Sequence, residues 1–318
     1  MKIIIFAGGL GNQMFQYAFF YANRKKYRDL KATTFWYNAN KSHNGFELDK
    51  VFNISKEGFI FSKNKAKNLP ENEKKAAISN NSKEYTEKKQ KELQNVSNSK
   101  LTKIIRYILN NNPFLTFKEF GDSKYFENIF DKKGLMILSG YWQNQRYFIE
   151  EKDEICKIFQ FIPLENTEND EKNRQIIEKI NAENSVSIHV RRGDYVSNSW
   201  FDGVVTTEYY QKSVDFIKTK VQNPQFFVFS DDLDWCKAEL KLPDNAVFVD
   251  WNSGKNSFRD MQLMSLCRHN IITNSSFSWW GVWLNRNAEK IVVRPQKWIS
   301  ESSGLDFSEI CPEEWVAL

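Results

Sequence analysis

The sequence has few of the residues that build metal and disulfide sites. Its 318 residues include four cysteines and three histidines, and no two cysteines form a CxxC pair. The histidines, His43, His189 and His269, also lack the spacing of metal ligands. This pattern argues against a structural zinc site and favours a protein whose cysteines are reduced.

Long apolar runs are also absent. No stretch approaches the roughly 20 apolar residues of a membrane span. Residues 1–7 lack the basic start and the long apolar stretch of a secretory signal. We therefore expect a cytoplasmic protein.

The net charge of +5 is concentrated in one segment of the chain. Residues 62–112 hold 12 Lys or Arg against 5 acidic residues, so the rest of the chain is slightly acidic. A nucleic-acid-binding protein more often carries a basic face with interleaved aromatic residues on its folded core. The segment has only Tyr85 and Tyr107, and we expect no nucleic-acid partner.

The same segment predicts an insertion of about 62–112 with a helix near its end. Its first part, 62–98, is rich in Lys, Asn and Glu and has little surface to bury. Apolar residues then recur at helical spacing over 101–109, with basic residues around them. This basic amphipathic helix would either pack on its own domain or lie against an anionic membrane surface.

The length favours two domains of about 150 residues each. The first half opens with a predicted strand at 2–7, a glycine-rich turn and a helix at 13–27. A second buried strand at 135–139 leads into an aromatic stretch and a helix that ends near residue 160. A polar break at 163–170 predicts the boundary, with domains at 1–165 and 166–318.

The second half alternates short apolar runs with helical patterns. The runs predict buried parallel strands at 185–190, 225–230, 246–250, 270–273 and 290–294. Helices are expected at 208–221, 233–240, 257–266 and 277–284. This alternation is typical of an open doubly wound α/β sheet.

Polar side chains follow the predicted strands of the second half, at the edge where such sheets bind ligands. They are His189, Arg191, Arg192, Asp194, Asp231, Asp232, Ser275 and Ser276. An arginine could hold a pyrophosphate through two parallel hydrogen bonds, and a helix that starts at the serines would favour the same anion. The aspartates after the second strand could accept from a ribose or a guanine.

Each of these features has a structural alternative. The segment 191–194 could be only a charged turn in which Asp194 pairs with an arginine. Asp231 and Asp232 could cap a helix or form a metal-binding pair. Trp279, Trp280 and Trp283 stand at helical spacing, which is more typical of a core than of a ligand wall.

The turn at residues 8–14 does not match a dinucleotide-binding motif. Met14 stands where GxGxxG needs its third glycine, and the second strand, near 32–37, ends in Asn38 without an acid for a ribose. We expect this loop to bring backbone N–H groups and the Asn12 amide into an interdomain cleft.

Five blocks in this order resemble the bacterial α1,2-fucosyltransferases. They are GGLGNQMFQYA (8–18), GYWQNQRYF (140–148), HVRRGDY (189–195), FSDDLDWC (229–236) and DMQLMSLCRHNIITNSSFSWWG (260–281). The resemblance implies a GT-B-like fold, in which two Rossmann-like domains face a cleft. It also implies GDP-β-L-fucose as the donor, inversion at the anomeric carbon, a galactose-terminated acceptor and no obligatory metal or other cofactor.

The resemblance also implies roles for single residues. His189 and Arg191 would contact guanine and pyrophosphate, Asp231 or Asp232 the nucleoside, and Ser275 and Ser276 a phosphate. Asn12 would approach the fucose, and the cleft loop and acceptor side would involve Gly9, Gly11, Gln13, Trp142 and Gln143. The insertion departs from the usual family pattern on this acceptor side.

Three roles are needed for the transfer: binding the leaving group, stabilising an oxocarbenium-like centre and removing a proton. Arg191 serves the first, and Asp194 is the candidate base or else a support for Arg191. Two other functions stay open. The chain could transfer another sugar or form another linkage, or it could be a sugar-nucleotide-binding regulator without turnover.

Overall fold

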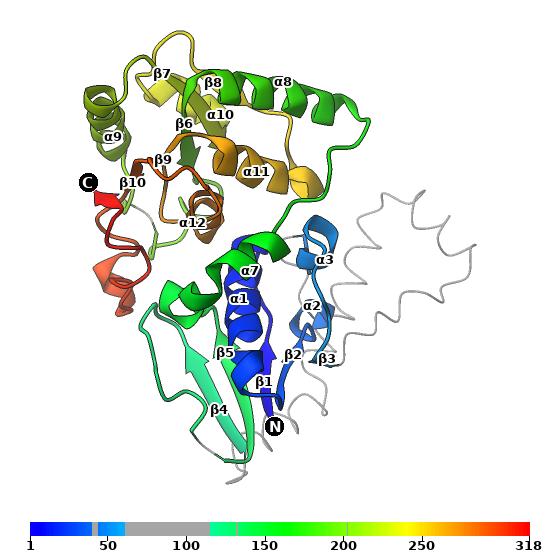
Figure 1. Cartoon of the computed structure of the whole chain (residues 1–318). Coiled ribbons are helices and arrows are strands. Elements are labelled where there is room, and N and C mark those ends of the chain that lie inside the picture. The colour runs from blue at the N-terminus through cyan, green and yellow to red at the C-terminus, as the bar shows by residue number, and fades with distance from the viewer. Residues whose placement is uncertain (40–43, 61–114, 132, 202) are drawn as a thin grey trace, which may run out of the picture.

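The computed structural model describes residues 1–39, 44–60, 115–131, 133–201 and 203–318 (Figure 1). The predicted insertion at 62–112, with its basic helix at 101–109, and His43 lie outside the described residues. None of the helices in the described ranges combines the length and the apolar character needed to cross a bilayer.

The first unit is built on a parallel sheet in the order β3-β2-β1-β5-β4. These strands are β1 (Lys2–Ile5), β2 (Leu30–Thr33), β3 (Phe59–Ile60), β4 (Leu115–Phe120) and β5 (Leu135–Gly140). The central strand β1 aligns Ile5 with Thr33 on one side and with Ser139 on the other. The unit also contains α1 (Leu10–Lys26), α2 (Trp36–Ala39), α3 (Leu48–Val51), α7 (Lys152–Ile158) and two 3-10 turns, Gln145–Tyr147 and Ile149–Glu151.

The second unit has a parallel sheet in the order β11-β10-β9-β6-β7-β8. Its strands are β6 (Asn184–Val190), β7 (Pro224–Ser230), β8 (Val247–Val249), β9 (His269–Ile271), β10 (Val292–Arg294) and β11 (Val316–Ala317). Six of the seven residues of β6 are buried, as a strand covered on both faces requires.

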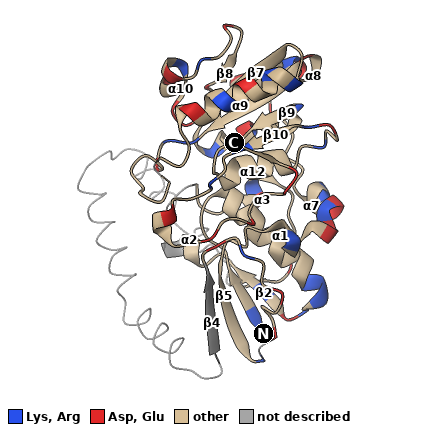
Figure 2. Ribbon diagram, turned by 90° about the vertical axis from the view of Figure 1, so that its left-hand side faces the viewer, with Lys and Arg blue, Asp and Glu red and all other residues tan. Residues whose placement is uncertain are grey.

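One helix precedes the first strand of this second sheet, and four others connect its strands. They are α8 (Glu168–Ala182), α9 (Thr207–Lys220), α10 (Leu233–Glu239), α11 (Phe258–Leu266) and α12 (Ser276–Trp283), with 3-10 turns at Gly254–Asn256 and Glu301–Ser303. Side chains of Thr167, Thr206, Asp232 and Ser275 cap four of these helices. Figure 2 shows charges of both signs on outer helices such as α7 and α8.

The predicted fold class is confirmed: two Rossmann-like units with parallel sheets form a GT-B-like α/β architecture (Figure 1). The domain boundary near residue 165 stays a prediction. Two predicted elements in the first unit are corrected. Helix α1 begins at Leu10 instead of residue 13, and the strand expected at 32–37 ends at Thr33 and gives way to α2.

The two units meet through aromatic side chains on α1 and α12. The ring of Phe15 on α1 lies 4.4 Å from that of Trp279 and 5.0 Å from that of Trp280 on α12. Phe148 stacks on Trp280 at 5.6 Å. All four side chains are fully buried in one core cluster, so the tryptophans serve the core rather than a ligand wall.

A second contact fixes the distance between these helices at their first turns. A Cβ atom added to Gly11 of α1 would lie 2.6 Å from the backbone carbon of Ser276 and 2.7 Å from the backbone nitrogen of Phe277. Gly11 is therefore the residue that lets the start of α1 touch the start of α12.

A buried ion pair holds the segment that joins the units. Arg259 on α11 pairs with Asp170 on α8, and both side chains are at most 10% exposed. The Arg259 guanidinium also donates to the carbonyls of Ile162 and Pro163, at 2.7 and 2.8 Å. The connection between the units is thus tied to the second unit through charged hydrogen bonds.

We predict that Gly11→Ala destabilises the protein by about 1–3 kcal/mol, because the new methyl group meets backbone that cannot move alone. Alanine is otherwise the better helix former, so helix propensity acts in the opposite direction. Denaturant unfolding of the variant measures the difference. Gly121→Ala is the control, since a Cβ there meets only Leu305 at 3.5 Å. A Gly11→Ala midpoint at or above that of the wild type would contradict the tight junction.

Candidate functional site

The carboxyl edge of the second sheet gathers the polar residues predicted there. Strand β6 delivers the segment 189–194, its neighbour β7 delivers Asp231 and Asp232, and β9, on the other side, leads to Ser275 and Ser276. The three strands are adjacent in the order β9-β6-β7, so the side chains meet at one place.

Asp231 fixes the loop that carries both arginines. Its Oδ1 accepts from the backbone N–H of Arg192 at 2.9 Å, and its Oδ2 accepts from that of Gly193 at 3.1 Å. The Oδ2 atom also lies 3.0 Å from Nη1 of Arg191. Asp231 therefore positions the loop, and its expected contact with a nucleoside stays a prediction.

Asp232 orients the second arginine and caps α10. One carboxylate oxygen accepts from the backbone N–H of Trp235 at 3.2 Å, and the other from Nε of Arg192 at 3.0 Å. The Arg192 guanidinium lies over the Trp235 ring, 4.1 Å from its centroid. Nη1 and Nη2 of Arg192 have no partner among the described residues. The helix-cap alternative for Asp232 is confirmed, and four guanidinium N–H groups of Arg192 stay available to a ligand.

Arg191 lies between two carboxylates. Its Nε atom donates to Oδ1 of Asp194 at 2.9 Å, Nη2 lies 2.7 Å from the same oxygen, and Nη1 lies 3.0 Å from Oδ2 of Asp231. Two of its five N–H groups are left for a ligand. Asp194 is 57% exposed, and within the described residues its Oδ2 atom accepts no hydrogen bond. Asp194 therefore supports Arg191 and still has one oxygen facing outward.

His189 is the penultimate residue of β6 and lies against the first turn of α12. It is 6% exposed, its ring packs 5.6 Å from that of Phe277, and its Nδ1 atom has no partner among the described residues. Burial, helped by the charge of Arg191, lowers the pKa of His189 to about 3. The imidazole is therefore neutral at physiological pH.

The start of α12 completes this edge. Ser275 caps the helix by accepting from the N–H of Phe277 at 3.3 Å, and Ser276 begins the helix beside Gly11. The Tyr195 hydroxyl donates to the carbonyl of Asn274 at 3.2 Å and so ties the arginine loop to α12. The positive end of the α12 dipole thus lies at the same sheet edge as the arginine loop.

The first unit brings its glycine-rich turn to the same junction. Asn12 is half-buried in the first turn of α1, and its Oδ1 accepts from Nε2 of Gln143 at 2.8 Å. Gly9 is the N-cap of α1, and Gly11 touches α12 as described above.

Two residues expected on the acceptor side belong to the interior. Gln13 is fully buried; it donates to the carbonyls of Gly8 and Gly45 and accepts from the N–H of Glu47. Trp142 is 2% exposed and stacks on Phe19 at 4.3 Å. Their burial closes these side chains off from the surface, and their expected place on the acceptor side stays a prediction. The pattern GYWQNQ could not show which of its aromatic residues points inward.

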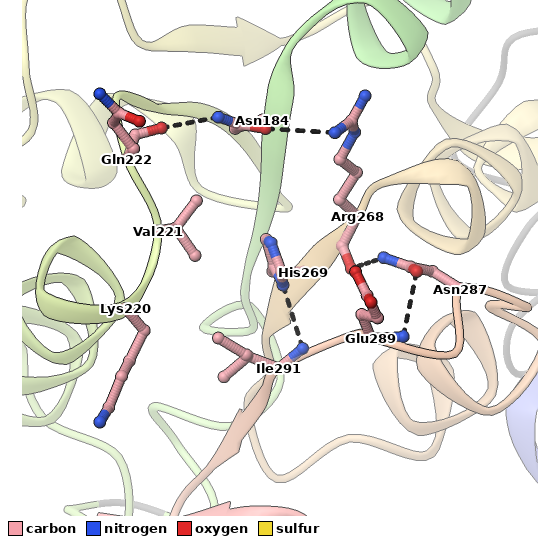
Figure 3. Close-up of a pocket in the computed structure, with 9 residues that line it drawn as sticks. All are labelled: Asn184, Lys220, Val221, Gln222, Arg268, His269, Asn287, Glu289 and Ile291. Carbon is pink, nitrogen blue, oxygen red and sulfur yellow. Dashed lines mark hydrogen bonds between the residues drawn. The ribbon is translucent and has the colours of Figure 1, made fainter.

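Two cavities of the described surface lie away from this edge. One of about 450 Å³ is found at the opposite, amino-terminal edge of the second sheet, where His269 accepts from the N–H of Ile291 (Figure 3). Another of about 690 Å³ runs along α1 and is lined by residues such as Tyr21 and Arg24. Neither contains a residue of the predicted donor site.

Comparison with known proteins decides the family. A model described as Glycosyl transferase family 11 matches residues 1–318. The chain belongs to this glycosyltransferase family. The family resemblance predicted from the sequence is thereby confirmed.

Curated relatives agree with family 11 membership. An alpha-1,2-colitosyltransferase from Escherichia coli is 37% identical over 100% of this chain and 99% of its own length. The O-antigen biosynthesis glycosyltransferase WbnK, also from Escherichia coli, is 33% identical over 98% of both. Galactoside 2-alpha-L-fucosyltransferase SEC1 from Bos taurus is 31% identical over 31% of this chain and 28% of its own length.

Two solved structures are more distant from this family 11 chain. Fucosyltransferase NodZ from Bradyrhizobium is 14% identical with a TM-score of 0.44, over 88% of this chain and 90% of that one. A mutant of Arabidopsis thaliana FUT1 in complex with GDP is 14% identical with a TM-score of 0.41, over 93% and 71%. Neither likeness is close enough to transfer the role of a residue.

Sequence reasoning missed three residues of the family 11 site. Gly193 is needed because a Cβ there would lie 2.7 Å from Oδ2 of Asp231. Trp235 supports Arg192, and Tyr195 connects the loop to β9. The glycine was the signal available in the sequence, since a glycine between charged residues after a strand often marks a close backbone approach.

We predict that His189 makes the protein sensitive to acid. Its pKa in the folded protein is below its ordinary value of 6.5, so the unfolded chain binds the proton first. The resulting stability is complete above pH 6.5 and is lost as the pH falls toward 3. At pH 5 the loss should be about 2 kcal/mol relative to pH 8. Denaturant unfolding at both pH values, with His189→Gln as the comparison, tests this; parallel losses in the two proteins would contradict it.

Proposed function

We propose that this family 11 glycosyltransferase moves L-fucose from GDP-β-L-fucose to the 2-hydroxyl of a galactose, with inversion and release of GDP. The acceptor would be an oligosaccharide or a glycan repeat unit, and no metal or other cofactor would be required. Support comes from the family and from the galactoside fucosyltransferase among the relatives.

One observation carries the donor part of this proposal: the loop with two arginines shares a sheet edge with the start of α12, to which the Tyr195–Asn274 hydrogen bond ties it. Arg192 keeps four guanidinium N–H groups and Arg191 keeps two, which suits the paired oxygens of a pyrophosphate. A helix N-terminus and two guanidinium groups can together bind a diphosphate without a metal ion. The carboxylates hold the arginines in place before the donor arrives.

These groups would also promote departure of GDP. Negative charge grows on the leaving diphosphate as the bond to the sugar breaks. Arg191, Arg192 and the α12 dipole would stabilise that charge better in the transition state than in the bound donor. His189, neutral because it is buried, adds a hydrogen-bonding ring without adding a further charge.

Asp194 is the candidate for removing the acceptor proton. One of its oxygens supports Arg191, while the other faces outward on a side chain that is 57% exposed. Inversion requires the acceptor hydroxyl to attack from the side opposite GDP. Asp194 can accept its proton only if the bound sugar lies over the arginine loop, and the alternative is a purely supporting role.

A second candidate donor sugar is colitose, because the 37% identical relative is named a colitosyltransferase. Colitose is L-fucose without its 3-hydroxyl. A site that hydrogen-bonds this hydroxyl would reject the deoxy sugar strongly, whereas an apolar site would discriminate little. The rates of transfer from GDP-fucose and from GDP-colitose can therefore distinguish the two donor sugars.

Product analysis tests the reaction. We expect the purified chain to convert GDP-fucose and lactose into a fucosylated trisaccharide and GDP, with the 2-linkage identified by NMR. The yield should be unchanged by EDTA, because arginines and a helix end replace the metal. GDP-colitose is run in parallel. If neither donor sugar is transferred while GDP still binds, the chain is a nonenzymatic binding protein. If EDTA abolishes the transfer, Asp231 and Asp232 are reassigned as metal ligands.

We predict that Arg191→Lys cripples the enzyme although the charge is kept. A single ammonium cannot reach Asp194, Asp231 and a phosphate oxygen together. The loss should be about 2–3 kcal/mol, or roughly 30-fold to 150-fold in kcat/KM. Arg174→Lys, an exposed arginine on α8 that pairs with Glu171, is the control. Near wild-type kinetics for Arg191→Lys would contradict the phosphate-binding role.

Asp194→Asn separates the two roles of this carboxylate. If Asp194 is the base, the variant should keep its affinity for GDP and lose turnover. Calorimetric titration with GDP and steady-state kinetics give the two values. A folded variant that no longer binds GDP would assign Asp194 to support of Arg191 instead.

A further inference from the structure

We infer that Phe35 and Tyr141 form an aromatic subsite that binds the sugar rings of the acceptor glycan. The inference rests on the proposed function and assigns the acceptor to residues other than Gln13 and Trp142, which are buried. Four observations carry it: the position of both residues at one edge of the first sheet, the exposure of their side chains, the contact of Tyr141 with the glycine-rich turn, and a polar group beside them.

The sheet topology places the two aromatic residues at the same, carboxyl edge. Strand β1 pairs with β2 on one side and with β5 on the other. Phe35 follows the end of β2 by two residues and Tyr141 directly follows β5, so they leave the sheet on either side of β1.

Both side chains are exposed at this edge. Phe35 is 59% exposed and Tyr141 is 39% exposed, whereas Phe6 and Trp142 nearby in the sequence are buried and Trp36 and Tyr37 are half-buried. A single exposed aromatic residue needs no explanation, but two at one sheet edge beside a candidate site suit a ligand. One face of a galactose ring carries a patch of C–H groups, which stacks well on an aromatic ring.

The glycine-rich turn connects this subsite to the donor edge. Gly8 has a φ of +80°, and a Cβ there would lie 3.2 Å from Cε1 of Tyr141. Its carbonyl accepts from the Tyr37 hydroxyl at 2.8 Å, which fixes the turn. Three residues later, Gly11 touches Ser276 at the start of α12. A chain of three residues spans at most about 10 Å, so a sugar on Tyr141 lies within reach of a donor bound at α12.

A polar group lies next to the aromatic pair. Because Oδ1 of Asn12 accepts from Gln143, the Asn12 amide has a fixed orientation. Its Nδ2 atom would be only 2.7 Å from a Cβ on Gly8, beside Tyr141, and it has no partner among the described residues. Aromatic faces with one oriented amide donor suit a neutral glycan, which offers C–H faces and hydroxyl acceptors.

The test compares Phe35→Ala and Tyr141→Ala with Tyr141→Phe and with Leu266→Ala, an exposed apolar residue at the end of α11. We expect each alanine variant to raise the KM for lactose about tenfold, since stacking on an aromatic ring is lost. The KM for GDP-fucose and its slow hydrolysis without acceptor should not change. Tyr141→Phe and Leu266→Ala should behave as the wild type.

The outcomes separate this inference from the proposed function. An unchanged KM for lactose in both alanine variants, in an enzyme that transfers fucose, overturns the subsite alone. An equal rise in the KM for donor and acceptor also overturns it, because that pattern indicates a structural role. If the wild type transfers nothing, the proposed function fails; saturation-transfer NMR with lactose and GDP then tests the subsite without turnover. Lactose signals that persist in both alanine variants would overturn it.

Discussion

The contact between the first turns of α1 and α12 is the constraint on which the site depends. Gly11 lets the backbone of α1 reach Ser276 and Phe277, and the rings of Phe15, Trp279 and Trp280 hold the helices together behind that contact. Because α1 follows β1 and α12 follows β9, the contact brings the carboxyl edges of two separate sheets to one place. Neither sheet alone carries both the arginine loop and the glycine-rich turn.

The charges at the donor edge are arranged for an anion although they do not sum to a positive value. Two arginines face three aspartates. Asp231 and Asp232 use their oxygens on backbone N–H groups and on guanidinium N–H groups that point back into the loop. Among the described residues the remaining N–H groups of Arg192 have no partner, while its Nε bond to Asp232 and its stacking on Trp235 orient them. Hydrogen-bond donors that are already in position before the ligand arrives contribute more to binding than net charge does. The entropy cost of ordering these donors has been met during folding.

The strand and helix pattern of the second unit could be predicted from the sequence, and the roles of its polar residues only in part. Buried apolar runs place β6 and β7 within one residue of their bounds, because strands covered on both faces leave a clear signal. The sequence cannot show that Asp231 turns toward the loop at 192–193, since this depends on the neighbouring strand. Gln13 and Trp142 looked accessible because they lie in motifs with glycine and polar residues, yet tertiary packing buries both.

The two sides of the junction meet different physical demands. A diphosphate is always the same anion, so its side is built from fixed ion pairs, where one carboxylate aligns several donors at once. A glycan presents neutral rings whose hydroxyls vary, and stacking on exposed aromatic residues tolerates that variation, since it depends on the C–H face more than on each hydroxyl. A transferase of this kind can therefore change its acceptor by altering Phe35 or Tyr141 without disturbing Asp231 and the arginine loop. The glycine-rich turn is the element that both sides share, and for that reason its close contacts with Tyr141 and Ser276 leave it the least room to change.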